Sequence, residues 1–146
     1  MGEGHMMRYL IFALLWATTA QANHELEGRD IKAGRRLYAE TCAACHGADL
    51  EGQPDWGTPN ENGILPAPPH DATGHTWHHD NTLLCEYTKF GGQAALAARG
   101  INDFASGMPA FEEVLSDEDI WDILAYIRST WPPREQAVQA SRNRAH

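Results

Sequence analysis

The stretch AETCAACHGADLEG, residues 39–52, places Cys42, Cys45 and His46 within five residues of one another. Two thiols with two residues between them lie about one helical turn apart when the segment is helical. An imidazole follows the second thiol directly. Several chemistries use paired thiols, so features elsewhere in the sequence are needed to distinguish them.

Three of these chemistries fit the chain poorly. A thioredoxin-like redox pair starts a helix within a βαβ unit, whereas these cysteines end a predicted helix and no segment predicts a strand. A structural zinc site needs a fourth ligand; Cys85 has no partner cysteine, although the histidines at 75–79 could supply one. A disulfide between Cys42 and Cys45 would leave His46 and the long loop after it unexplained.

The fourth chemistry is covalent attachment of haem, for which C-x-x-C-H is the attachment pattern. Each thiol adds to one vinyl group of a porphyrin, and the imidazole then lies under the iron. A second axial ligand is expected opposite His46, and a methionine there would raise the reduction potential. Outside the N-terminal leader the chain has one methionine, Met108 in FASGMPAF, between a glycine and a proline. The alternatives are that Met108 fills a gap in the core or that a histidine replaces it as ligand.

Three amphipathic segments predict helices. The first runs from Asp30 into the cysteine motif, and the second covers 80–92, where a pair of glycines stops it. The third starts at Ser116 with a capping-box pattern and ends before Pro132. The long Gly- and Pro-rich segment between the first two helices is unusual for a compact domain unless it wraps around something.

These features resemble a class I cytochrome c, and the resemblance covers essentially all of the mature chain, from about Asp30 to Trp131. The resemblance rests on CAACH, on the later GMPAF and on the final helix sequence IWDILAYI. It implies an all-α small cytochrome c fold, with three main helices and long loops wrapped around one covalent haem c. It also implies a crossing of the first and last helices at small and aromatic residues. The matching residues are Gly34, Tyr38, Ile123 and Tyr126.

The resemblance further implies residues around the haem. Cys42 and Cys45 would form the thioether bonds, and His46 and Met108 would be the axial ligands of the iron. A proline carbonyl accepts the imidazole N–H in this family, and Pro68 in LPAPPH is the candidate. Trp77, like Trp56, would pack on a haem edge or donate its N–H toward a propionate.

Two features depart from the family pattern or lie outside it. Cys85 is interpreted as a small buried apolar residue, with a reactive thiol or a dimer bridge as alternatives. The segment HDATGHTWHH, residues 70–79, is interpreted as a polar surface loop, with a copper or zinc site as the alternative.

The N-terminus predicts export. Arg8, a short apolar run and the small residues before Asn23 form a signal-peptide pattern over 1–22, within which 1–5 would be an overlong leader. The apolar run is too short to predict a membrane span. We therefore expect a periplasmic protein with a cytochrome c domain at 23–133 and a flexible polar tail at 134–146.

The net charge of −9 argues against nucleic-acid binding and favours redox partners that present basic patches. The expected function is one-electron transfer between larger redox proteins by a monomer that is not itself an enzyme. One alternative is a small-ligand sensor or peroxidase-like enzyme, if Met108 leaves the iron open. Another is metal handling through the histidine-rich loop.

Overall fold

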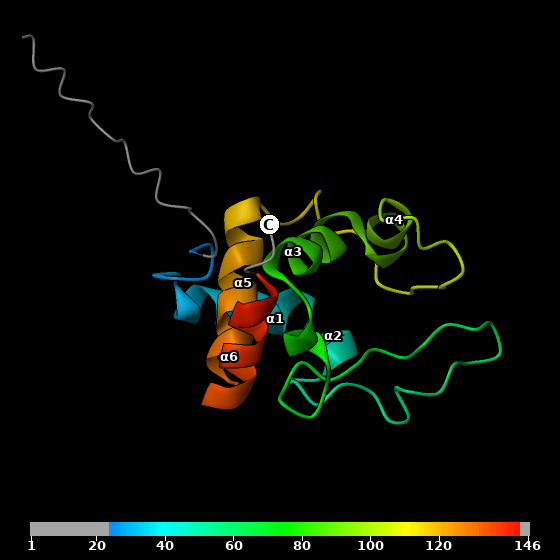
Figure 1. The fold of residues 1–146 in the computed structure, drawn as a ribbon, viewed down its shortest axis with the longest axis horizontal. Helices are drawn as coiled ribbons and strands as arrows, with labels where there is room; N and C mark the ends of the chain where they lie inside the picture. Colours follow the sequence, from blue (N-terminus) through cyan, green and yellow to red (C-terminus); the bar gives the residue numbers. More distant parts are fainter. Residues whose placement is uncertain (1–23, 144–146) are drawn as a thin grey trace, which may run out of the picture.

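The computed structural model describes residues 24–143, and every regular element in that range is helical (Figure 1). The elements are α1 (Ile31–Thr41), α2 (Ala43–His46), the 3-10 turn η1 (Thr76–His78), α3 (Asn81–Phe90), α4 (Gly92–Ala97), α5 (Asp117–Ser129) and α6 (Pro133–Arg142). The described residues contain no strand, which agrees with the all-α fold expected from the sequence. The signal peptide predicted for residues 1–22 lies outside the described residues.

The first helix begins as the sequence predicts and ends earlier. The Asp30 carboxylate caps it by accepting the backbone N–H groups of Lys32 and Ala33, each at 3.0 Å. Cys42 interrupts the helix, so that the predicted continuous helix is divided into α1 and α2. The junction therefore lies at the first thiol of the motif.

The central contact of the fold is the crossing of α1 and α5 (Figure 1). Gly34 lies directly against the backbone of Asp122, where a Cβ atom would fall 2.0 Å from the Asp122 carbonyl oxygen. Tyr38 is buried beside it, with its ring 5.6 Å from that of Tyr126. Ile123 is also buried, so that all the residues predicted for this crossing lie in or next to it.

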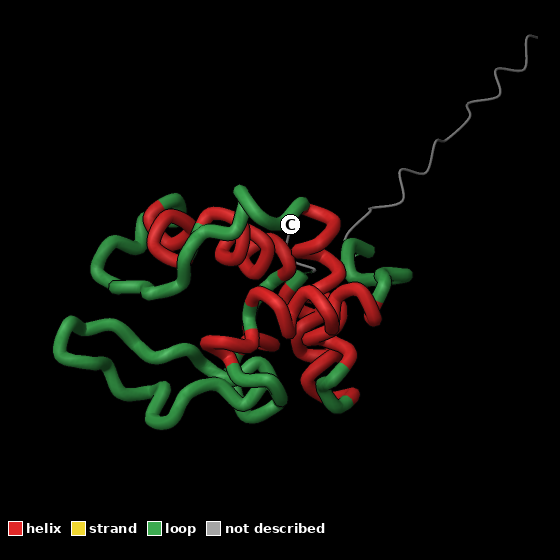
Figure 2. The backbone as a smooth tube through the Cα atoms, turned by 180° about the vertical axis from the view of Figure 1, so that it is seen from behind, coloured by secondary structure: helices red, strands yellow, loops and turns green. Residues whose placement is uncertain are grey.

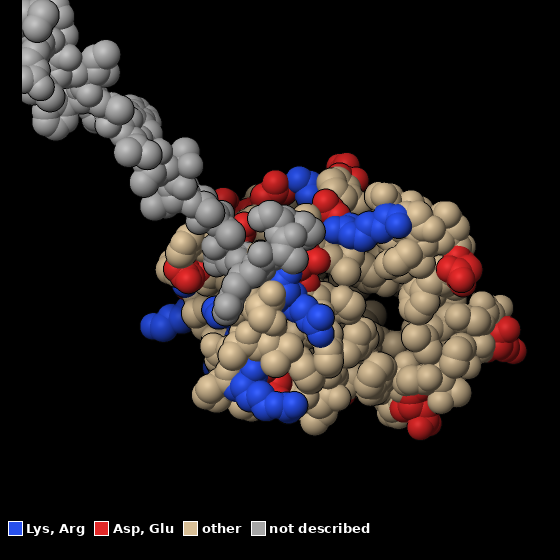
Figure 3. Space-filling model, viewed as in Figure 1, with Lys and Arg blue, Asp and Glu red and all other residues tan. Residues whose placement is uncertain are grey.

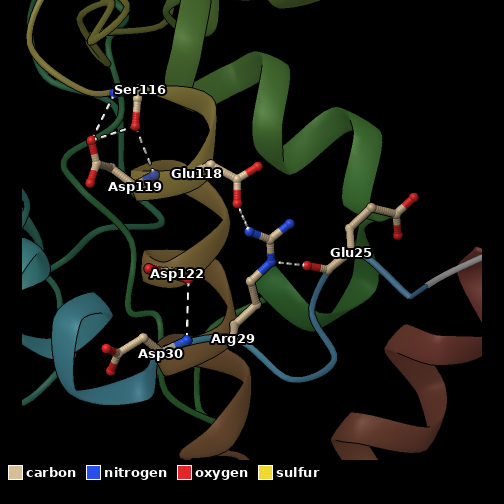
Figure 4. A network of polar contacts seen from close by, with 7 residues as sticks. All are labelled: Glu25, Arg29, Asp30, Ser116, Glu118, Asp119 and Asp122. Atoms are coloured by element: carbon tan, nitrogen blue, oxygen red, sulfur yellow. Dashed lines mark hydrogen bonds and ion pairs between the residues drawn. The ribbon is translucent and has the colours of Figure 1, made fainter.

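The third predicted helix, α5, has its apolar face in the core. Ser116 and Asp119 form the predicted capping box, in which each side chain accepts from the other residue's backbone N–H (Figure 4). The large buried side chains of this helix recur with helical spacing, and they are Ile120, Ile123, Leu124 and Ile127. Ala125 and, just beyond the helix end, Trp131 are buried as well.

Polar contacts tie the segment before α1 to α5 (Figure 4). The Arg29 guanidinium forms an ion pair with Glu118 and donates from Nε to the Glu25 carbonyl oxygen at 2.5 Å. The Asp30 backbone N–H donates to Asp122 Oδ1 at 3.3 Å. Both helices of the crossing are thus also joined at the N-terminal end of α1.

Most of the tail predicted at 134–146 is helical in the described residues, where it forms α6. Pro132-Pro133 ends α5 as expected, but Pro133 is also the first residue of α6, where its missing N–H costs nothing. The buried residues of α6 and its cap are polar. Gln139 Nε2 donates to Asn81 Oδ1 at 2.6 Å, and the Asn81 N–H donates to Asn143 Oδ1 at 2.7 Å. Amide hydrogen bonds, rather than an apolar stripe, hold α6 against α3 and η1.

Two long loops extend to one side of the helices (Figure 2). The first covers 51–70 and the second 98–110, which follows the short helix α4 that the sequence did not predict. They meet where Gly107 faces Ile64: a Cβ atom at Gly107 would lie 3.0 Å from Ile64 Cγ2. Among the described residues, no helix combines the length and apolar character that crossing a membrane requires.

Candidate functional site

The two thiols of the motif lie on successive turns at the junction of α1 and α2. The Cys45 N–H donates to the Cys42 carbonyl oxygen at 3.1 Å, which places the residues about one turn apart. Cys42 is buried and Cys45 exposed, and neither forms a disulfide. Burial raises the pKa of the Cys42 thiol.

His46 ends α2 with its ring buried and its orientation fixed. Its Nδ1 lies 2.9 Å from the carbonyl oxygen of Pro68, the proline singled out in the sequence. A carbonyl oxygen can only accept, so Nδ1 carries the proton and Nε2 has a free lone pair. Burial lowers the pKa of His46, which favours this neutral form. The ring is therefore prepared to bind a metal through Nε2.

His70 supports His46 in a way that the sequence did not indicate. The two rings stack with centroids 4.0 Å apart. His70 Nδ1 is hydrogen-bonded to Thr76 Oγ1 at 2.8 Å, and Trp131 Nε1 donates to the His70 carbonyl oxygen at 2.7 Å. Burial, followed by the nearby His46, lowers the pKa of His70 well below its usual value. A neutral imidazole thus packs on the ring of His46.

Met108 lies on the second long loop, half-buried, with its backbone held on both sides. The Gly92 N–H donates to the Met108 carbonyl oxygen at 3.1 Å, and the Met108 N–H donates to Ser106 Oγ at 3.3 Å. Ser106 Oγ in turn lies 2.7 Å from Tyr87 Oη on α3. The sequence indicated Met108 but not Tyr87, Ser106 or Gly92, because their contacts join α3 and α4 to a distant loop.

The two tryptophans between α2 and α3, Trp56 in the first loop and Trp77 in η1, contact residues of that same connection. Trp77 Nε1 donates to the Ala72 carbonyl oxygen at 3.3 Å. The N–H that was expected to donate toward a haem propionate therefore already has a hydrogen-bond partner. Trp77 packs against the core, and its ring lies 3.7 Å from that of His78. Trp56 stacks on His75, with centroids 5.5 Å apart.

The surface between the two loops is hollowed. Figure 3 shows a recess between the lobe that carries α4 and the lobe formed by the first loop. Large apolar side chains near the second loop remain exposed, and they are Phe90, Ile101 and Phe104. Exposed apolar surface beside a recess, with two thiols and a prepared imidazole in the same chain, fits a flat apolar cofactor held covalently.

The remaining cysteine behaves as an apolar residue. Cys85 is half-buried in α3 and packs against the core. Burial, with the Asp117 carboxylate second, raises the pKa of its thiol to about 11. The thiolate is therefore scarce at neutral pH, which agrees with the interpretation of Cys85 as a packing residue.

The fold and the prepared thiol and imidazole groups define a small c-type haem protein. Residues 31–131 match the cytochrome c family, and this range is most of the chain. The chain therefore belongs to the cytochrome c family, whose members carry covalent haem c and transfer electrons through it. Haem c is accordingly its cofactor.

Two curated relatives show the range of proteins that contain a similar sequence. The chain is 29% identical over 103 residues to the Cbb3-type cytochrome c oxidase subunit FixP of Bradyrhizobium sp. (strain ORS 278), covering 70% of this chain and 28% of the relative. It is 29% identical, over an alignment 171 residues long, to the thiosulfate dehydrogenase of Stutzerimonas stutzeri (strain A1501), covering 99% of this chain and 47% of the relative. The chain thus spans less than half the length of either relative. No solved structure matches it.

Proposed function

We propose that this protein is a periplasmic one-electron carrier with a single haem c, ligated by His46 and Met108 and bonded through Cys42 and Cys45. The haem supplies the one-electron redox chemistry. The chain's own residues hold it, orient its ligands and exclude water. With both axial positions filled, little rearrangement would accompany electron transfer, and no position would be open to a substrate.

The observation that carries this proposal is the hydrogen bond from His46 Nδ1 to the Pro68 carbonyl. It sets the tautomer and orientation that an axial ligand needs, in a ring adjoining the two thiols. The fixed backbone of Met108 supports the second ligand. Tyr87 and Ser106 hold this loop on α3, which limits how far Met108 could move away.

The test is an absorption spectrum of protein made together with haem-maturation enzymes. We expect a sharp reduced α-band from haem that stays with the protein on acid-acetone extraction, and a weak far-red band in the oxidised state that marks methionine–iron ligation. In Met108→Leu the far-red band should disappear and the reduced protein should bind carbon monoxide. His78→Ala, as a control, should retain the band. Carbon monoxide binding by the unaltered protein at neutral pH would instead favour a sensor or a peroxidase-like enzyme.

A second candidate is an enzyme that oxidises thiosulfate, favoured by the relative named thiosulfate dehydrogenase, whose alignment takes in 99% of this chain. This activity would require thiosulfate to reduce the haem at a rate that saturates with thiosulfate concentration. Stopped-flow measurement of haem reduction separates the two functions. A rate that stays negligible at millimolar thiosulfate, while an artificial donor reduces the haem rapidly, would exclude thiosulfate oxidation and leave electron transfer as the function.

The partner would dock on the side of the two loops. No lysine or arginine occurs from residue 37 to residue 88, and the lobe of the first loop shows only acidic charges in Figure 3. Exposed carboxylates in these loops are Glu51, Asp55, Glu61 and Asp103, and the one exposed cation, Arg99, is paired with Glu86. Opposite charges steer association, so a partner with a basic docking surface is favoured.

This docking is tested by the salt dependence of reduction by a cationic redox reagent. Neutralising Asp55→Asn together with Glu61→Gln should lower the rate constant at low ionic strength and flatten its fall with salt. Glu40→Gln on α1 changes the net charge by half as much and lies outside the loops, so it should have a much smaller effect. Equal effects per charge removed would assign the steering to the net charge rather than to the loops.

A further inference from the structure

The histidines on either side of η1 have no role in the proposed electron transfer. His75 precedes the turn and His79 follows it. The turn is closed by backbone hydrogen bonds from His78 N–H to the His75 carbonyl at 2.9 Å and from His79 N–H to the Thr76 carbonyl at 3.1 Å. It brings the two outer imidazoles together: their centroids lie 5.3 Å apart, with the planes at 77°.

This separation is the one that two imidazoles adopt around a shared metal ion. Imidazole nitrogen binds Zn²⁺ at about 2.0–2.1 Å, so tetrahedral coordination by two rings places their centroids roughly 5 Å apart. The observed separation of 5.3 Å would thus need little change, and each ring would have to turn one nitrogen toward the ion. Zn²⁺ and Cu²⁺ are the common divalent ions that imidazole suits.

Neighbouring groups restrict the ring of His75 and the backbone of His79. His75 stacks on Trp56 with the planes only 13° apart. The carbonyl oxygen of His79 accepts from Gln139 Nε2 at 3.4 Å, and α6 packs on η1. Residues that limit the motion of ligands in this way reduce the entropy that binding would cost.

The charge state of the pair also suits a metal. Partial removal from water lowers the pKa of His75 and of His79, with the nearby histidines acting in the same direction. Both rings are therefore neutral near pH 7, with a lone pair to donate. Asp80 adds negative charge beside His79, and Arg142 of α6 opposes it.

We propose that His75 and His79 bind one divalent transition-metal ion, Zn²⁺ or Cu²⁺, at a site separate from the haem. Among residues 24–143, no set of three or more His, Cys, Asp or Glu side chains converges on a common point. The site is therefore open, with water completing the coordination shell. The ring of His78 packs on Trp77 rather than joining the pair.

The test is a calorimetric titration of the haem-loaded protein with ZnCl₂ at pH 7, after treatment with EDTA and without a histidine tag. We expect one equivalent to bind. His79→Gln and His75→Gln should each weaken binding by at least about tenfold, because each removes one of two protein ligands. The absorption spectrum and the thermal unfolding of each variant show whether its fold is intact.

His24→Ala is the matched control, since His24 is an exposed histidine paired with Glu27 outside the loop. It should bind Zn²⁺ as the unaltered protein does. Two results would overturn the proposal: no stoichiometric binding by the unaltered protein, or binding that both glutamine variants retain. If a glutamine variant were to unfold, the Cu²⁺ electron paramagnetic resonance spectrum of the unaltered protein would decide, because two nitrogen ligands give a splitting that one or none does not.

Discussion

Gly34 of α1 touches the backbone of Asp122 of α5, with no room for a side chain between them. A Cβ atom at this position would also lie 2.5 Å from the Asp122 carbonyl carbon. The obstacle is backbone, which cannot rotate away as a flexible side chain can. The helix crossing on which the site is built therefore depends on a glycine at residue 34.

Replacing this glycine should separate the two helices. We expect Gly34→Ala to lower the free energy of unfolding of the haem-loaded protein by at least about 3 kcal/mol, the upper part of the range for overpacked cores. Guanidinium unfolding followed by circular dichroism measures it. Gly57→Ala, where no other atom lies within 4 Å, should change the value by less than about 0.5 kcal/mol. Equal losses in the two variants would contradict the steric argument.

The hydroxyl of Tyr87 should stabilise the position of Met108. Tyr87→Phe removes the hydrogen bond to Ser106, whose hydroxyl accepts from the Met108 N–H, at an expected cost of about 1 kcal/mol. The far-red band of the oxidised protein should then disappear at a lower pH on alkaline titration. Tyr126→Phe is the control, because Tyr126 packs against Tyr38 at the helix crossing. A titration unchanged in Tyr87→Phe would show that the loop is held by other contacts.

The amide network under α6 should contribute to global stability. Gln139→Ala leaves Asn81 Oδ1 without its shortest hydrogen bond in a buried position, so the free energy of unfolding should fall by about 1–3 kcal/mol. Chemical unfolding detects the loss. Ser141→Ala on the exposed side of the same helix should stay within about 0.5 kcal/mol of the unaltered protein. If α6 were only loosely attached, both variants would behave alike.

Cys85 should react slowly with alkylating reagents. Its pKa of about 11 exceeds the usual thiol value of 9.0. Between pH 9 and pH 11 the thiol of Cys85 therefore keeps its proton in the folded state and loses it in the unfolded chain. With haem bonded to the other two cysteines, alkylation by iodoacetamide near pH 8 should be about a hundredfold slower than in the unfolded chain, and its rate should keep rising beyond pH 9. Cys85→Ser should show no reaction. Because the folded state holds the proton, the contribution of Cys85 to stability should decline as pH rises from 9 toward 11.

The elements that could be predicted from the sequence are those set by local pattern. Ser116 and Asp119 form the capping box of α5 because both partners lie within one turn, and Asp30 and Asp80 cap their helices for the same reason. LPAPPH contains three prolines, and the loop geometry places the carbonyl of Pro68 against His46.

The elements that escaped prediction depend on contacts between distant residues. The helix α6 buries Gln139 and Asn143 rather than apolar residues, so a search for an apolar stripe could not find it. The stacking of His70 on His46 and the bond between Tyr87 and Ser106 each join segments whose approach only the folded chain defines. Polar contacts over long sequence separations leave no periodic signal.

Asn81 also brings together the two ends of the described chain. Its side-chain N–H donates to Glu25 Oε2 at 3.0 Å, while its backbone N–H donates to Asn143 Oδ1 at 2.7 Å. A peptide linker that joined residue 24 to residue 143 would therefore start and end close to the same residue of α3. The exposed loop at Gly57 offers a place for new termini, as in successful circular permutations. A circularly permuted form, with residues 24 and 143 joined and new termini at Gly57, could thus be inserted into another protein.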